Sequence, residues 1–126
     1  MRNKFYFIWL LVFISCNSNI KIEKDIISKW DVDKVEYVNL NKFAPDGVNE
    51  GAYFDFKENG EVELSNYLQG IRTGRWNVLN DTIFIEIDNE TPRFRIEKMN
   101  ERELILSTRI DKNDELLKFY LIRMEK

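Results

Sequence analysis

The sequence predicts an all-β fold, an eight-stranded antiparallel up-and-down β-barrel, with a β-sandwich as the alternative. Three observations support this prediction. Apolar and polar residues alternate from residue 30 onward, breaks rich in Gly, Asn and Asp separate the alternating segments, and no segment carries a sustained helical stripe. Such alternation is typical of half-buried strands, and many short strands with frequent breaks are typical of barrels and sandwiches.

Each of the eight expected strands is recognised by apolar residues two positions apart. In chain order they are Trp30 and Val32; Phe54 and Phe56; Val62 and Leu64; Trp76 and Val78; Ile83, Ile85 and Ile87; Phe94 and Ile96; Leu104 and Leu106; and Leu117, Phe119 and Leu121. Residues 20–28 have no clear period and are expected to form a linker or one short helical turn. An eight-stranded barrel is just wide enough to be filled by side chains, so the inward aromatic residues are expected to form a core, with a ligand box as the alternative.

Three tight turns follow from the parity of the strands, because a shift of one residue would send every side chain to the other face. Phe54 and Phe56 face Leu64 and Val62 only across a loop of odd length, which residues 58–60 supply with Gly60 at the left-handed position. Trp76 and Val78 face Ile85 and Ile83 across the pair 80–81. Residues 100–102 similarly join the strands of Ile96 and Leu106.

Longer connections are expected at the opposite end of the barrel, at residues 39–51, 68–73, 88–92 and 111–115. In an up-and-down meander, alternate connections lie at the same end, so these loops would surround one mouth. Aromatic and apolar residues there are candidates for binding a small ligand: Tyr37, Phe43, Tyr53, Tyr67 and Ile87. Tyrosine combines an apolar ring with a hydroxyl that orients a ligand. The alternative is that these side chains simply pack under the loops.

The first sixteen residues differ from the rest of the chain. Arg2 and Lys4 precede an unbroken apolar run from Phe5 to Ile14. This run has the length of a secretory signal and about half of the roughly 20 residues that a membrane-spanning helix needs. It ends at Ser15-Cys16, and Cys16 is the only cysteine of the chain.

A small residue followed by cysteine at the end of an apolar run resembles the lipobox of bacterial lipoproteins, although Phe13 stands where that family usually has Leu. The resemblance implies cleavage before Cys16 and acylation of that residue. It divides the chain into a signal peptide (1–15), a lipidated Cys16 with a tether (16–27) and a barrel domain (28–126). It also implies an exported protein, anchored by lipid at the periplasmic face of the outer membrane. An ordinary signal peptide with an incidental cysteine and an uncleaved anchor are the alternatives.

Composition excludes several kinds of chemistry. The 126 residues contain no histidine and one cysteine, so histidine-based catalytic triads, histidine metal sites and disulfides within the chain are ruled out. Setting aside Arg2 and Lys4, 17 basic residues remain against 22 acidic ones, a net charge of −5. No basic stripe is present to bind nucleic acid. Because no nucleophile and base can be paired, we expect no enzyme activity, no catalytic residue, no metal and no cofactor.

The barrel segment resembles the small lipocalin-like domains of bacterial lipoproteins. Ser28-Lys29-Trp30 matches the Gly-x-Trp element of their first strand, with serine in place of glycine, and Gly74-Arg75-Trp76 matches their recurrent Gly-x-Trp unit. The resemblance implies that Arg123, on the last strand, lies across Trp30 at a closed barrel floor. Unlike full lipocalins, the chain is short and lacks their disulfide and C-terminal helix.

Two functions are therefore expected, of different classes. The first is a membrane-tethered lipocalin-like protein that binds a small apolar or amphipathic ligand at the mouth. The alternative is a periplasmic module that binds or inhibits an envelope protein without a small ligand. It would use the loops or the outward apolar residues Phe84, Ile105, Tyr120, Ile122 and Met124, unless the isoleucines of the N-terminal segment cover that patch.

Overall fold

A computed structural model of the chain describes residues 22–45, 50–66, 70–110 and 115–124. Within these residues the chain forms nine strands and a 3-10 turn, and residues 22–26 form a short helical turn before the first strand. The elements are β1 (Ser28–Tyr37), η1 (Val38–Leu40), β2 (Lys42–Phe43), β3 (Tyr53–Phe56), β4 (Glu61–Asn66), β5 (Gly70–Leu79), β6 (Thr82–Glu86), β7 (Arg93–Met99), β8 (Glu103–Ile110) and β9 (Glu115–Arg123).

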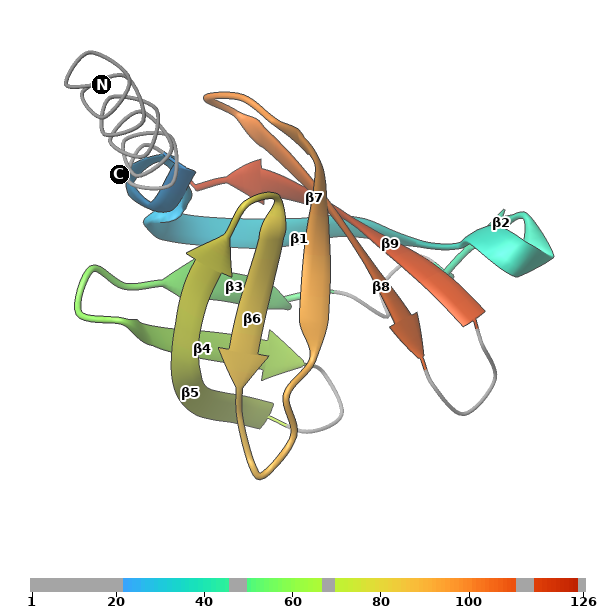
Figure 1. Ribbon diagram of the computed structural model, residues 1–126. Helices are drawn as coiled ribbons and strands as arrows, with labels where there is room; N and C mark the ends of the chain where they lie inside the picture. The colour runs from blue at the N-terminus through green and yellow to red at the C-terminus, as the bar shows by residue number, and fades with distance from the viewer. Residues whose placement is uncertain (1–21, 46–49, 67–69, 111–114, 125–126) are drawn as a thin grey trace, which may run out of the picture.

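Eight of these strands close into an antiparallel barrel (Figure 1). Each strand pairs with the next along the chain, and β1 pairs with β3 on one side and with β9 on the other. This double pairing of β1 distinguishes a barrel from a sandwich, since it leaves no open edge between the first and last strands. The eight-stranded up-and-down barrel predicted from the sequence is confirmed, with β2 as an additional short strand beside the end of β1.

The registers of all three predicted hairpins are confirmed. Phe54 pairs with Leu64, Trp76 with Ile85, and Ile96 with Leu106. Gly60 has a φ of +88°, in the left-handed region that a side chain disfavours. In the turn at 80–81 only Asn80, with a φ of +57°, adopts this conformation.

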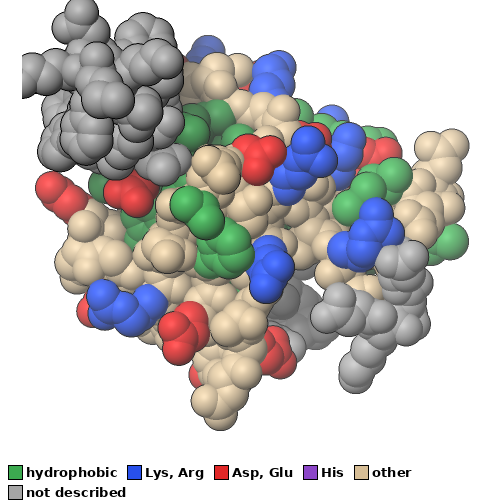
Figure 2. All heavy atoms as spheres, in the orientation of Figure 1, with side chains coloured by type: hydrophobic (Ala, Val, Ile, Leu, Met, Phe, Trp, Pro, Cys, Tyr) green, Lys and Arg blue, Asp and Glu red, His purple; other side chains and the backbone are tan. Residues whose placement is uncertain are grey.

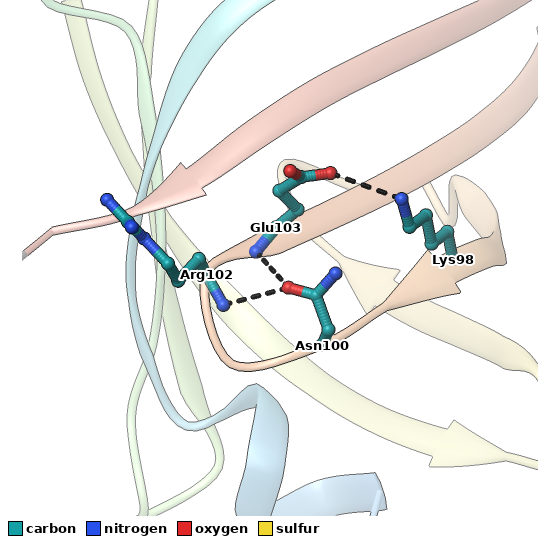
Figure 3. A network of polar contacts seen from close by, with 4 residues as sticks. All are labelled: Lys98, Asn100, Arg102 and Glu103. Atoms are coloured by element: carbon teal, nitrogen blue, oxygen red, sulfur yellow. Dashed lines mark hydrogen bonds and ion pairs between the residues drawn. The ribbon is translucent and has the colours of Figure 1, made fainter.

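The third tight turn joins β7 to β8 and is held by one side chain (Figure 3). The Asn100 Oδ1 accepts hydrogen bonds from the backbone N–H groups of Arg102 and Glu103, at 2.9 and 2.8 Å. An asparagine that binds the backbone two and three residues ahead mimics a backbone turn. The Nζ of Lys98 lies 3.4 Å from the Oε2 of Glu103 across the same hairpin. Local side-chain chemistry therefore determines this turn.

The connections at the other end differ from the expected ones. The loop predicted at 68–73 is shorter, because β5 already begins at Gly70 and pairs with the end of β4. The expected loop at 39–51 contains η1 and β2. At 88–92, Ile87 and Glu90 exchange backbone hydrogen bonds across Asp88 and Asn89, which both have positive φ. The expected loop at 111–115 lies outside the described residues except for Glu115, which begins β9.

A bulge in β1 changes which of its side chains face inward. The pairing with β9 shifts between Val32 and Lys34, which leaves Asp33 as an extra residue. Trp30 and Val32 face inward before the bulge, and Val35 and Tyr37 face inward after it. Simple alternation along β1 cannot show this shift, because the extra residue reverses the parity.

The core fills the barrel between these strands. Trp30, Phe54, Phe56 and Phe94 are buried, and Trp76 and Phe119 pack against them. The ring centroids of Phe54 lie 5.6 Å from Phe94 and 5.7 Å from Phe119, both edge to face, an arrangement that aromatic pairs prefer. The structure thus places the six inward aromatic residues in or against a packed core.

Candidate functional site

One end of the barrel is closed by the N-terminal turn and by Arg123. The Arg123 guanidinium carbon lies 4.6 Å from the ring centre of Trp30, which is completely buried. The Nη2 of Arg123 donates to the backbone oxygen of Asp25 at 2.6 Å, and the Trp30 Nε1 donates to the backbone oxygen of Ile26 at 2.9 Å. These two bonds attach the turn at 22–26 to the barrel. Ile26 is fully buried in the core, so this end forms a floor and not an entrance.

Trp76 lies in the same part of the barrel and is held from the adjacent hairpin. Its Nε1 donates to the backbone oxygen of Lys57 at 3.0 Å, and its ring lies 5.2 Å from that of Phe56. The backbone N–H of Trp76 donates to the oxygen of Gly60 at 2.9 Å. The tight turn around Gly60 is therefore fastened to β5 at the floor.

The structure separates the residues that sequence reasoning grouped at the mouth. Ile87 is 4% exposed and belongs to the core, and Tyr37 faces inward on β1 and is half-buried. Phe43 and Tyr53 lie on the outer face of the barrel. Tyr67 lies outside the described residues. Tyr37 and Ile87 alone among these five therefore face the barrel interior in the part of the chain that the structure describes.

Phe43 and Tyr53 lie outside for different reasons. Tyr53 alternates with the inward Phe54, and its hydroxyl donates to the Glu63 Oε2 at 3.2 Å while Lys29 lies over its ring. Phe43 is on β2, which pairs with the end of β1, and its ring lies 6.1 Å from that of Tyr120. A parity count from Phe54 would have placed Tyr53 outside, but only the tertiary structure locates β2.

Two tyrosines on the outer face have a pKa above the ordinary value for tyrosine. Partial burial, reinforced by the carboxylate of Glu63, raises the pKa of Tyr53. The hydrogen bond that Tyr120 donates to Glu36, at 2.8 Å, raises the pKa of Tyr120. Both hydroxyls donate hydrogen bonds to these carboxylates on the outer face, and the raised pKa reflects the stabilised protonated form.

An open groove lies between β7 and β8, which we call the lateral groove. The two strands pair only as far as Arg95 and Ser107, although β8 continues to Ile110 and β7 begins at Arg93. Beyond this point the hydroxyl of Thr108 donates to the backbone oxygen of Arg93 at 2.7 Å. A side chain therefore takes the place of the ladder hydrogen bond where the strands separate. Figure 1 shows β8 and β9 diverging from β6 and β7 at this place.

The lateral groove has a volume of about 1140 Å³ and combines charged walls with an aromatic base. Phe94 and Phe119 line it and also belong to the aromatic core, where their rings lie 5.9 Å apart, so the groove reaches the barrel interior. The connection between β6 and β7 borders it, which places it at the end opposite the floor. Its charged lining residues are Arg93, Arg95, Arg109, Glu90 and Glu97. Small-molecule sites have volumes of roughly 300–1,000 Å³, so the groove is large enough to hold a ligand.

Acidic residues dominate a second groove, which lies between β1, β2 and β3. It has a volume of about 780 Å³, and its lining includes Asp31, Asp33 and Glu50 against the single cation Lys34. It lies where the pairing of β1 with β3 ends at Asp31 and the pairing of β1 with β9 skips Asp33. Three carboxylates and little aromatic surface make this groove less suited than the lateral groove to an apolar ligand.

Sequence reasoning missed an arginine that faces inward at the open end. Arg72 shares the inward face of β5 with Trp76, and its Nε lies 2.6 Å from the Asp88 Oδ2. The Arg72 side chain is 28% exposed. Parity with Trp76 would have located it, had the strand been extended back to Gly70. The ion pair fixes the turn between β6 and β7, which borders the lateral groove.

Apolar residues also gather on the outer face of β8 and β9. Ile105 pairs with Tyr120, whose ring contacts Phe43, and Ile122 is 43% exposed. In Figure 2, hydrophobic side chains and Lys or Arg side chains lie beside one another on the visible face. Ile22 and Ile26 pack against the core at the floor, so these two isoleucines do not cover this patch.

Two further features concern metal ligands and membrane-spanning helices. In that part of the chain, no group of three or more His, Cys, Asp or Glu side chains is arranged to hold a metal ion. None of the helices that the structure describes is long and apolar enough to cross a membrane. No protein-family model matches the chain, and no curated protein shows significant similarity to it.

Proposed function

We propose that this protein is a membrane-tethered, lipocalin-like lipoprotein that binds a small apolar or amphipathic ligand at the open end of its barrel. The observation that carries the proposal is the lateral groove, which reaches the aromatic core beside Phe94 and Phe119. An apolar base with a few polar groups at the rim is typical of small-molecule sites. The stacking of Arg123 on Trp30 closes the other end, so a ligand would enter from the groove side.

The lipid anchor and the cellular location are part of the same proposal. The protein would be exported and held at the periplasmic face of the outer membrane through acylated Cys16, which lies outside the described residues. Acyl chains stabilise attachment by about 0.8 kcal/mol for each buried methylene, so several chains hold a protein without a spanning helix. The proposal assigns the protein no catalytic residue, metal or cofactor.

Ligand binding is expected to be detectable with an uncharged fluorophore. N-phenyl-1-naphthylamine, titrated into the purified full chain, should gain emission as it leaves water. Ile110→Ser should weaken this binding about tenfold, since Ile110 lines the lateral groove and loses most of its apolar surface. Leu79→Ser is the matched control, because Leu79 is 56% exposed on the outer face near the floor. Equal loss in both variants, or no emission change in the parent, would contradict the proposed site.

Membrane attachment has a separate test. Cys16→Ser is expected to move the protein from the membrane fraction to the soluble fraction of the envelope, because serine offers no thiol for acylation. Fractionation with immunoblotting reads the result, and mass spectrometry of the parent shows the acylated Cys16. If Cys16→Ser stays in the membrane with its signal intact, the anchor is not this cysteine.

A second candidate function is favoured by the outer apolar patch of Ile105, Tyr120 and Ile122. No segment among the described residues covers it fully, and exposed apolar patches mark interaction sites. In this reading the protein is a periplasmic module that binds an envelope protein. A partner that copurifies in stoichiometric amount and is lost on Ile122→Glu would favour this function over the first.

A further inference from the structure

The lateral groove opens where continued pairing would bring two arginines together. The last pair between β7 and β8 is Arg95 with Ser107. Continued in the same register, Phe94 would lie opposite Thr108, and Arg93 opposite Arg109. Directly opposed residues lie on the same face with their Cβ atoms about 5 Å apart, where like charges are destabilising. Continued pairing at this point would therefore place two like charges directly opposite each other.

The same alternation places the charged and apolar groups at different depths. Arg93 pairs with Phe84 on the outer face and its guanidinium lies 5.5 Å from the ring of Phe84, so it stands at the outer rim. Arg109 has the outward parity of Ser107 and stands on the opposite rim. Phe94 and Phe119 lie at the inner side. A cationic rim above an aromatic base is complementary to a molecule with an anionic head and an apolar tail.

The groove lining also contains two acidic residues. The Glu97 Oε1 accepts a hydrogen bond from the Ser107 hydroxyl at 2.7 Å, which holds that carboxylate beside the last strand pair. Glu90 lies in the turn between β6 and β7. Arg95 lies 3.4 Å from Asp81 in an exposed ion pair. With Arg95 paired to Asp81, Arg93 and Arg109 stand against Glu90 and Glu97 in formal charge. The position of the two arginines at the outer rims, and not an excess of positive charge, is what suits an anion there.

We propose that the lateral groove selects amphipathic ligands with an anionic headgroup, a carboxylate or a phosphate monoester, which binds between Arg93 and Arg109 while the tail lies against Phe94 and Phe119. This inference rests on the proposed function and adds the class of ligand. Arginine binds carboxylate and phosphate through charge-assisted hydrogen bonds. A bound anion also offsets repulsion between the positive charges of Arg93 and Arg109, so ligand binding stabilises the separated arrangement of β7 and β8.

Isothermal calorimetry on the purified full chain tests this class directly. Four probes share a twelve-carbon chain and are used below their micellar concentrations: dodecanoate, dodecyl phosphate, dodecyl maltoside and dodecyltrimethylammonium. Both anionic probes are expected to bind about tenfold more tightly than the uncharged maltoside, and the cationic probe more weakly than the maltoside. A preference for one anion identifies whether carboxylate or phosphate is the better headgroup. Raising the salt concentration should reduce the anionic advantage.

Substitution of the two rim arginines tests whether they cause the tighter binding of the anionic probes. Arg93→Gln and Arg109→Gln should each remove most of the anionic advantage and leave the affinity for dodecyl maltoside unchanged. Arg102→Gln, in the turn at the floor, removes the same charge far from the groove and should change neither affinity. Circular dichroism checks that each variant keeps its β structure. Because the lost quantity is a ratio between probes, a general loss of stability cannot imitate it.

The outcomes separate this inference from the proposed function. If the maltoside and the uncharged fluorophore bind but the anions have no advantage, the headgroup inference is overturned and the proposed function stands. Equal loss for all probes in Arg93→Gln also overturns the inference, since it would indicate a packing role. If none of the four probes binds, both are overturned.

Discussion

Replacing Trp30 by alanine is expected to lower the free energy of unfolding by about 3–5 kcal/mol, the range for large aromatic residues removed from a core. Trp30 is completely buried, stacks under Arg123 and donates to the oxygen of Ile26. Its loss would create a cavity at the floor and detach the turn at residues 22–26. Urea unfolding followed by far-ultraviolet circular dichroism measures the change.

A conservative variant separates the two contributions of this side chain. Trp30→Phe keeps an aromatic ring under Arg123 but loses the indole N–H, which leaves the buried oxygen of Ile26 without that donor. An unsatisfied buried polar group costs about 1–3 kcal/mol, so this variant should be less destabilised than Trp30→Ala. A loss below about 1 kcal/mol in Trp30→Ala would show that the floor does not depend on this residue.

Gly74→Ala is expected to destabilise the barrel by about 1–3 kcal/mol, the usual cost of forcing extra atoms into a packed site. A Cβ at Gly74 would collide with the backbone oxygen of Glu86 and lie 2.9 Å from the Cβ of Ile87. The obstacle is backbone, which cannot swing away as a flexible side chain would. The change would displace the end of β6 and the turn that carries Asp88, the ion-pair partner of Arg72.

A neighbouring substitution provides the control for Gly74. Thr73 precedes it on the same strand and is exposed, so Thr73→Ala should change the free energy of unfolding by less than about 0.5 kcal/mol. Urea unfolding compares the two variants under the same conditions. Equal stability of Gly74→Ala and the parent chain would mean that the end of β6 moves away at no cost, contrary to the packing described above.

The strand order and hairpin registers could be predicted because they depend on local patterns. Phe54 and Phe56 alternate with Asp55 and Lys57, so one face had to be buried. Gly60 occurs where an odd loop needs a left-handed residue, and its φ of +88° agrees. Each hairpin is closed by residues near one another in the sequence, and the correct register is the one that places the alternating apolar side chains on the same, inward face.

The candidate site was predicted less well, because it depends on departures from these patterns. The bulge at Asp33 reverses the parity of β1, and β2 carries Phe43 to the outer face. The lateral groove arises where β7 and β8 stop pairing, and both strands continue to alternate through that point. The alternation of inward and outward residues therefore cannot show where two neighbouring strands stop pairing.

The sequence by itself determined the eight barrel strands, their order, the tight turns and the aromatic core, because burial of alternating residues specifies them locally. The tertiary structure decided which strands separate and what the separation exposes. Arg93 and Arg109 are sixteen residues apart in the chain, and the end of the β7–β8 pairing at Arg95 and Ser107 leaves both beside the groove. The point at which these two strands stop pairing depends on how each strand also packs in the barrel, and the groove proposed to bind the ligand lies at that point.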